Sequence, residues 1–219
     1  MFFENLIKIL IKYYPIFLEG ALVTIVIAII TVLFGTIFGS ILALMKISNN
    51  KVLSIISSIY IEVFRGIPLL LQLWVIYLLT SSSLGKFVAV CLALILNSAA
   101  YVAEIVRSGI ASVDKGQMEA ARSLGLSKSI AMKKIILPQA IKNILPALGN
   151  EFVAVIKETS LASVFFIGEL MTVKNTITTL TYLSLEPYII IGVIYLVLTY
   201  SISKLIKFLE RKLNAVWLK

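Results

Sequence analysis

Long apolar runs, separated by short polar segments, make up most of the chain. A helix that crosses a bilayer needs about 20 mostly apolar residues, and five runs reach or approach that length. They cover approximately residues 16–45, 52–79, 87–110, 138–156 and 187–203. The pattern predicts an all-α membrane protein with about five transmembrane helices, folded as one domain over residues 1–219.

Residues 1–14 precede the first run and mix apolar with charged side chains. Phe2 and Leu6 alternate there with Glu4 and Lys8. The segment has no small-residue cleavage site after a short apolar core, so it does not read as a signal peptide. We predict an amphipathic helix that lies on the membrane surface.

Two residue pairs inside the runs predict helix contacts. Gly35 and Gly39 form a GxxxG pattern, which favours close packing against another helix. Glu62 and Arg65 stand about one turn apart, which predicts an ion pair within the second span.

Composition supports burial in a membrane. Of the 219 residues, 60% are hydrophobic and 14% are charged, whereas soluble domains are about half apolar and about one quarter charged. The net charge of +9 is not gathered on one face, which argues against nucleic-acid binding. With one cysteine, Cys91, and no histidine, the chain lacks the residues for a zinc site or a Ser/His/Asp triad.

The basic residues between the spans predict an orientation, because cytoplasmic connections carry an excess of Lys and Arg. One side contains Lys46, Lys51, Lys115, Arg122, Lys128, Lys133, Lys134, Lys204, Lys207, Arg211, Lys212 and Lys219, and the other contains Lys8, Lys12, Lys86 and Lys174. We expect the N-terminus outside and the C-terminus in the cytoplasm. The outer loop also carries Glu169, Lys174 and Glu186, which we expect to be solvated or to meet a solute-binding protein.

The connection at residues 114–137 contains a second kind of helix signal. Glu119, Ala120 and Ala121 suit a short helix, and Gly125 is placed to end it with a sharp turn. A new helix then starts near Lys128. An ordinary loop that re-enters the membrane would have a similar composition.

The spacing of this connection resembles the EAA signature of ABC importer permeases, in which the loop docks on an ATP-binding subunit. Glu119-Ala120-Ala121 is followed after three residues by Gly125, and after nine more by Ile135, one further residue and Leu137-Pro138. Three other segments are similar to the polar amino-acid branch of that family: residues 64–70 (FRGIPLL), 100–110 (AYVAEIVRSGI) and 157–163 (KETSLAS). Ile67 and Ser108 are mild departures from the family pattern.

The resemblance implies a type I importer permease in the inner cell membrane, with a cytoplasmic coupling helix formed by Glu119, Ala120, Ala121 and Gly125. Its expected partners are an ATP-binding subunit, an extracytoplasmic solute-binding protein, a second copy of the permease and membrane lipid. The chain has no Walker A motif. We therefore expect no enzyme activity and no cofactor in this subunit, with ATP and Mg on its partner.

Polar residues inside the spans are candidates for substrate binding, since ionisable groups there are costly and often functional. Asn97, Tyr101, Glu104 and Ser108 share one face of the third span. That face has an alternative role in helix packing, with Arg107 neutralising Glu104.

The segment after the fourth span interrupts the apolar pattern before Leu161. We predict a broken helix whose new N-terminus, at the backbone N–H groups of Leu161, Ala162 and Ser163, binds the α-carboxylate of an amino acid. The predicted binding residues are Asn97, Tyr101, Glu104, Glu158, Thr159, Ser160, Leu161 and Ser163. Glu158 has an alternative role in an ion pair with Lys157 or Arg107.

Two acidic groups, Glu104 and Glu158, favour a cationic substrate such as arginine, lysine or histidine. The alternatives are a neutral polar amino acid such as glutamine, an intramembrane enzyme, and a channel or structural membrane subunit outside the ABC class. The complete EAA-type loop is consistent with a homodimer.

Overall fold

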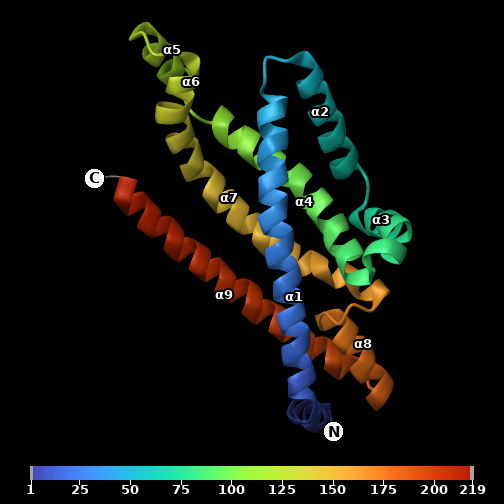
Figure 1. Ribbon diagram of the computed structural model, residues 1–219. Helices are drawn as coiled ribbons and strands as arrows, with labels where there is room; N and C mark the ends of the chain where they lie inside the picture. The colour runs from blue at the N-terminus through green and yellow to red at the C-terminus, as the bar shows by residue number, and fades with distance from the viewer. Residues whose placement is uncertain (1, 218–219) are drawn as a thin grey trace.

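The chain is helical throughout, as the computed structural model in Figure 1 shows. The structure describes residues 2–217, with side chains described for residues 2–212, so Lys219 lies outside it. Its elements are α1 Phe2–Lys46, α2 Lys51–Gly66, α3 Leu69–Leu84, α4 Lys86–Ala111, α5 Lys115–Ser123, α6 Lys128–Ala131, the π-helix Met132–Ile136, α7 Leu137–Glu158, the 3-10 helix Thr159–Phe165, α8 Leu170–Thr181 and α9 Leu185–Trp217. The expected all-α membrane fold is confirmed.

Three helices of the described chain, α1, α4 and α9, are long and apolar enough to cross a membrane. The expected single span at 52–79 is instead two helices, α2 and α3, bent by 109°. Pro68 explains the break because it lacks an N–H group and forces the preceding Ile67 into an extended conformation (φ −97°, ψ 136°). By length and composition the chain therefore has three or four spans, and the expected fourth span, α7, is not among them.

Residues 2–14, which we expect to lie on the membrane surface, form the first turns of α1. Phe2–Lys46 is one helix that runs through Pro15, although Figure 1 shows its first turns end-on and therefore bent away from the remainder. Ile9 is buried in a cluster with Ile177 of α8 and Ile190 of α9. Ile9 thus faces the protein, whereas Phe3, Ile7 and Ile11 are exposed, so a position of this segment on the membrane surface stays a prediction.

Helix α4 forms the centre of the molecule and packs against α1, α2, α3 and α7. Its buried face is rich in small residues, including Ala93, Ala99 and Ala103. A Cβ atom added to Gly35 would lie 2.9 Å from Ser98 Oγ, and one added to Gly39 would lie 2.7 Å from the Ala99 carbonyl oxygen. The predicted close packing at the GxxxG pattern is confirmed.

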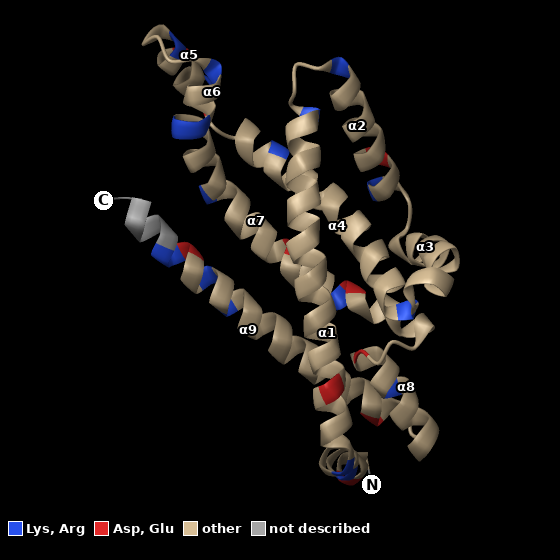
Figure 2. Cartoon of the chain, in the orientation of Figure 1, with Lys and Arg blue, Asp and Glu red and all other residues tan. Residues whose placement is uncertain are grey.

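The α5–α6 tip and the α1–α2 connection lie at one end of the molecule, and the N-terminus and α8 lie at the other (Figure 1). Figure 2 shows Lys and Arg on the tip, at the end of α1 and along the C-terminal half of α9. The larger set of basic residues, which the sequence assigns to one side of the membrane, thus lies mainly at one end of the molecule.

Gly39→Ala should lower the stability of the purified protein, because the added methyl group has no room beside the α4 backbone. An overpacked contact costs about 1–3 kcal/mol, which exceeds the roughly 0.5–1 kcal/mol that alanine gains over glycine in a helix. Gly192→Ala in α9 is the matched control, since nothing lies within 4 Å of its added Cβ. Thermal unfolding in detergent should shift downward for Gly39→Ala alone; equal midpoints would contradict the close contact.

Candidate functional site

Glu104 of α4, one of the two acidic residues expected to bind substrate, has its charge balanced within the chain. Its carboxylate accepts hydrogen bonds from Lys46 Nζ at 2.5 Å and from Arg107 Nε at 2.9 Å. Removing one partner of an ion pair that is shielded from water strongly destabilises the folded protein. The geometry favours the alternative role for Glu104, which is to join α4 to the end of α1.

Tyr101 and Arg65 form a second contact on this side of α4. The Arg65 guanidinium carbon lies 5.4 Å from the centroid of the Tyr101 ring, within the range of a cation–π interaction. The expected ion pair between Glu62 and Arg65 is absent from the described residues. Arg65 therefore links α2 to α4 through an aromatic ring rather than pairing within its own helix.

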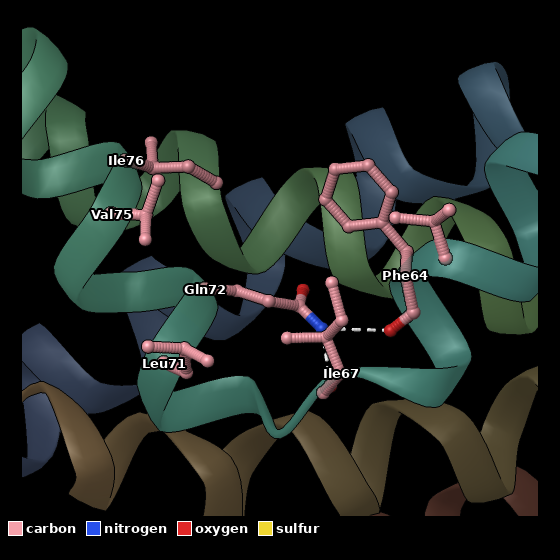
Figure 3. A pocket seen from close by; sticks show the side chains of 7 residues that line it. Phe64, Ile67, Leu71, Gln72, Val75 and Ile76 are labelled. Carbon is pink, nitrogen blue, oxygen red and sulfur yellow. Dashed lines mark hydrogen bonds between the residues drawn. The ribbon is translucent and has the colours of Figure 1, made fainter.

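Asn97 belongs to an amide cluster that stabilises the break between α2 and α3; Figure 3 shows its other member, Gln72, beside Phe64 and Ile67. Gln72 Nε2 donates to the carbonyl oxygens of Phe64 and Ile67, both at 2.7 Å. Asn97 Nδ2 donates to Gln72 Oε1 at 3.0 Å and to the Phe64 carbonyl at 3.3 Å. These bonds satisfy carbonyl groups that the interrupted helix leaves without partners, a requirement at membrane depth. Asn97 thus has a structural role here.

Gln72 was missed by sequence reasoning, although a buried amide four residues after a proline in an apolar run is a usable signal. Beside it lies a cavity of about 180 Å³, lined otherwise by apolar side chains of α2 and α3 that include Phe64, Leu71 and Ile76 (Figure 3). The cavity offers no charged group to an amino acid.

Glu151 and Glu158 form a second acidic site, on α7. They are seven residues apart and so lie on the same face of the helix, two turns from each other. Glu151 Oε1 accepts a hydrogen bond from Ser98 Oγ of α4 at 2.8 Å. Within the described part of the chain neither carboxylate lies within 4 Å of a basic nitrogen, so Glu158 pairs with neither Lys157 nor Arg107. Glu151 was not among the residues that the sequence predicted to bind substrate.

The two predicted acidic residues, Glu104 and Glu158, do not converge. Helices α4 and α7 are antiparallel, since Ser112 contacts Asn143 at one end and Ser98 contacts Glu151 further along. Glu104 lies six residues from Ser98 toward the first end, and Glu158 lies seven residues from Glu151 in the opposite direction. About 20 Å of helical rise separates them, which is too far for one amino acid to bridge.

The chain after Glu158 does not form the expected new helix start. It continues directly into the 3-10 helix Thr159–Phe165, with Thr159 in the right-handed helical region. The Thr159 hydroxyl is buried and donates to the Ile156 carbonyl at 2.7 Å, and the Ser160 hydroxyl donates to the Lys157 carbonyl at 2.6 Å. The backbone N–H groups near Leu161 and Ser163 therefore lie inside a continuous helical segment and are not a free carboxylate site.

Helix α8 is the one that starts afresh, and the chain caps it with its own carboxylate. Glu169 is fully buried and accepts hydrogen bonds from the backbone N–H groups of Met171 at 2.6 Å and Thr172 at 2.8 Å. Burial raises the pKa of the Glu169 carboxyl, and these hydrogen bonds oppose the shift. Lys174 and Glu186 are buried as well. The expectation that these three outer residues are solvated was wrong.

The predicted coupling helix is present as α5. Asp114 Oδ1 accepts from the Gly116 N–H at its start, and a Schellman motif closes its end. Leu126 N–H donates to the Ala121 carbonyl at 3.1 Å, Gly125 N–H donates to the Arg122 carbonyl at 3.0 Å, and Gly125 has φ 83°. The left-handed conformation expected of Gly125 is confirmed.

The residues expected to form the coupling helix differ in exposure. Glu119 and Ala120 are exposed, whereas Ala121 is 2% exposed and packs toward the chain's own following helices. Leu124 is 82% exposed at the tip and was not foreseen. The tip therefore presents a carboxylate, a small residue and a large apolar side chain.

A single helical rod joins this tip to the acidic pair. Helix α6, the π-helix and α7 follow one another without a break from Lys128 to Glu158. Leu137 N–H donates to the Met132 carbonyl in the wider π pattern, just before Pro138, which has no N–H to donate. Continuous helix, which includes Pro146, thus joins the α6 end of the tip to Glu151 and Glu158.

Residues 35–215 match the sequence profile of the family described as the binding-protein-dependent transport system inner membrane component. One relative is a Rickettsia bellii protein that is named as a glutamine transport system permease. It is 42% identical over 96% of this chain and 98% of its own length. The arginine transport system permease of Bacillus subtilis is 43% identical over 92% of this chain and 94% of its own length.

A solved structure gives the same picture. The crystal structure of an amino acid ABC transporter with histidines contains a chain that is 46% identical to this one. The two align with a TM-score of 0.88 over 93% of this chain and 96% of the other.

Glu104→Gln should destabilise the purified protein, because Lys46 and Arg107 then face an uncharged amide. We expect a loss of about 1–3 kcal/mol, below the 3–5 kcal/mol typical of fully buried pairs because this site is partly open to solvent. Glu4→Gln is the matched control, since it breaks the exposed Glu4–Lys8 pair. Chemical unfolding in detergent measures both, and equal losses would contradict the anchoring role.

Proposed function

This chain belongs to the family of binding-protein-dependent transport system inner membrane components, as an amino-acid permease of an ABC importer, and we propose that its substrate is a cationic amino acid such as arginine, lysine or histidine. Relatives are named for glutamine and for arginine, so the choice has to come from the chain's own charges. The observation that carries the proposal is the pair Glu151 and Glu158, which has no basic partner within 4 Å among the described residues.

The two acidic sites differ in whether the chain supplies basic partners for their carboxylates. Glu104 has Lys46 and Arg107 beside it, so it needs no ligand to balance its charge. A carboxylate held away from water without a counter-ion is unfavourable by several kcal/mol. A substrate with two cationic groups relieves both Glu151 and Glu158, whereas a neutral amino acid brings one ammonium for two carboxylates.

The spacing of the pair also suits a long cationic substrate. Two turns of helix separate Glu151 from Glu158, about 11 Å of rise. The side chain of arginine or lysine places its charged end several bonds from the α-ammonium group and so extends along this interval. We propose that the α-carboxylate meets Lys157, which directly precedes Glu158 in the chain. Lys157 and Ser160 line a cavity of about 290 Å³ with Tyr188 and Tyr195, and neither Glu151 nor Glu158 is among its lining residues.

The remaining predicted binding residues receive other roles in this proposal. Asn97 and Tyr101 hold α4 to the α2–α3 break, and Thr159 and Leu161 belong to the helical segment that supports Ser160. Ser163 remains a candidate for substrate contact from the same segment.

We also propose that α5 docks on a separate ATP-binding subunit, which binds ATP and Mg. Glu119 and Ala120 lie on its exposed surface, and Leu124 supplies an apolar contact. Movement of α5 would then reach Glu151 and Glu158 through the rod from Lys128 to Glu158. The basic tip in Figure 2 supports a cytoplasmic position for α5 and the C-terminus, with the N-terminus outside.

A solute-binding protein on the outer side and a second copy of this permease complete the proposed assembly. Helix α3 supports pairing, because Leu71, Leu78 and Leu79 are exposed on it. The matching crystal structure is that of an amino acid ABC transporter, and the likeness over most of both chains supports a role for this chain in a transporter of that kind.

Substrate selectivity tests the acidic pair. Glu151→Gln and Glu158→Gln should each weaken arginine binding by about tenfold or more, since about 1.4 kcal/mol corresponds to tenfold and a lost charge partner exceeds that. Glutamine binding should change less. Glu62→Gln, on the exposed side of α2, is the control. Binding to the purified permease and uptake into proteoliposomes are measured for arginine and for glutamine. If the ratio of arginine to glutamine is unchanged in both variants, the cationic assignment is refuted.

Coupling is tested by Gly125→Ala. The substitution forces a side chain into the left-handed region, which costs about 1–2 kcal/mol, and should distort the end of α5. Uptake and substrate-stimulated ATP hydrolysis should then fall together while substrate binding persists.

Gly85→Ala is the matched control for this strain, because Gly85 has φ 77° and open space around it but lies between α3 and α4. Co-purification of the ATP-binding subunit shows whether docking itself is lost. Equal reductions in both variants would mean that stability, rather than coupling, limits transport.

A further inference from the structure

Helix α9 carries a stripe along its exposed side whose character changes from apolar to basic. The α9 stripe consists of Val193, Val197, Tyr200, Lys204, Lys207 and Arg211, which follow one another at intervals of four, three, four, three and four residues. That spacing places them on one face of the helix. The first two are apolar, Tyr200 stands at the change, and the last three are cations.

The stripe is open to its surroundings. Val193 is 55% exposed, Val197 is 56% exposed and Tyr200 is 59% exposed. Only 11% of the most apolar stretch of α9 is buried within the chain, compared with 61% for α4. The apolar half of the stripe therefore faces whatever fills the membrane beside the protein.

The basic half has no acidic partner. Among the described residues, none of Lys204, Lys207 and Arg211 forms an ion pair. Lys204 Nζ lies 4.8 Å from the centroid of the Tyr200 ring, so Tyr200 holds this cation at the boundary. The three cations, with Ser203 and Phe208, line a hollow of about 400 Å³. Three donors around one hollow favour a ligand with an anionic group.

We propose that the α9 stripe binds an anionic phospholipid. The acyl chain lies along Val193 and Val197, and the headgroup phosphate occupies the hollow between Lys204, Lys207 and Arg211. From Val193 to Tyr200 the helix rises about 10 Å, which fits within one leaflet of a hydrocarbon core roughly 30 Å thick. Tyrosine is common at the level of the headgroups, where Tyr200 would lie.

Other occupants use less of the stripe. A second copy of the chain, packed through this face about a two-fold axis, would place cations against cations. An acidic segment of a partner protein would match the basic half but not the continuous apolar half. Free phosphate would likewise leave Val193 and Val197 without a role. A lipid with a charged head and an apolar tail matches both halves.

A fluorescent probe beside the hollow tests the proposal. Ser203→Cys, in a Cys91→Ser background, is labelled with bimane, and the full chain is reconstituted in phosphatidylcholine bilayers. A small fraction of either brominated phosphatidylglycerol or brominated phosphatidylcholine is then added as the quencher. We expect phosphatidylglycerol to quench at a mole fraction about tenfold lower or less, since Lys and Arg side chains near the membrane surface attract anionic lipids. High salt should reduce this preference.

The charge-removed variant Lys204→Gln, Lys207→Gln, Arg211→Gln should lose the preference. Lys128→Gln, Lys133→Gln, Lys134→Gln removes the same charge from the α6 end and should keep it. Equal quenching by the two lipids, or a preference that survives loss of the three α9 cations, would overturn the proposal. Weak quenching by both lipids would mean that protein covers the stripe, and would overturn it as well. The salt dependence is measured with all three cations in place, so it gives a result even where the triple variant folds poorly.

Discussion

The core of a bilayer has no water to hydrogen-bond a stranded carbonyl or to solvate a lone carboxylate, so this chain must satisfy such groups itself or leave them to a ligand. The break between α2 and α3 frees the carbonyl oxygens of Phe64 and Ile67, and Gln72 closes on both. Asn97 then fixes Gln72 from α4. A single proline therefore determines the position of two amides on two different helices.

The same constraint separates structural charges from candidate functional ones. Glu104 is neutralised by cations from α1 and α4, and that contact joins the two most closely packed helices. Glu151 accepts a hydrogen bond from the Ser98 hydroxyl, and neither Glu151 nor Glu158 has an ion pair among the described residues. In the substrate proposal, a cationic amino acid supplies the charge that the protein leaves unbalanced at these two residues. The requirement for internal pairing thus leads directly to the substrate proposal.

Close packing and continuous helix connect the acidic pair on α7 with the rest of the molecule. Gly35 and Gly39 bring α1 against α4 with no space for another methyl group, so α4 is held as a fixed support. Helix α7 lies on that support through the Ser98–Glu151 and Ser112–Asn143 contacts and is continuous with α6, which a short turn joins to α5. One helical rod therefore connects the proposed substrate carboxylates with the proposed site of ATPase docking. Helix α9 stands outside this support with most of its apolar surface uncovered, which is why lipid contact concerns it more than the other spans.

The sequence by itself determined the features that depend on composition and on local spacing. Apolar runs predicted the all-helical membrane fold, the small pair Gly35 and Gly39 predicted a close contact, and the EAA-type loop predicted a short helix ended by Gly125 in a left-handed conformation. Each follows from residues close together in the chain. Only the tertiary structure decided which charges are paired. Lys46 meets Glu104 across 58 positions and Ser98 meets Glu151 across 53, so their roles depend on how helices pack. The antiparallel arrangement of α4 and α7 also places Glu104 far from Glu158, so Glu151 takes the place of Glu104 in the proposed acidic pair. The reason is that the distance between side chains on different helices is set by how the helices pack and not by their spacing along the chain.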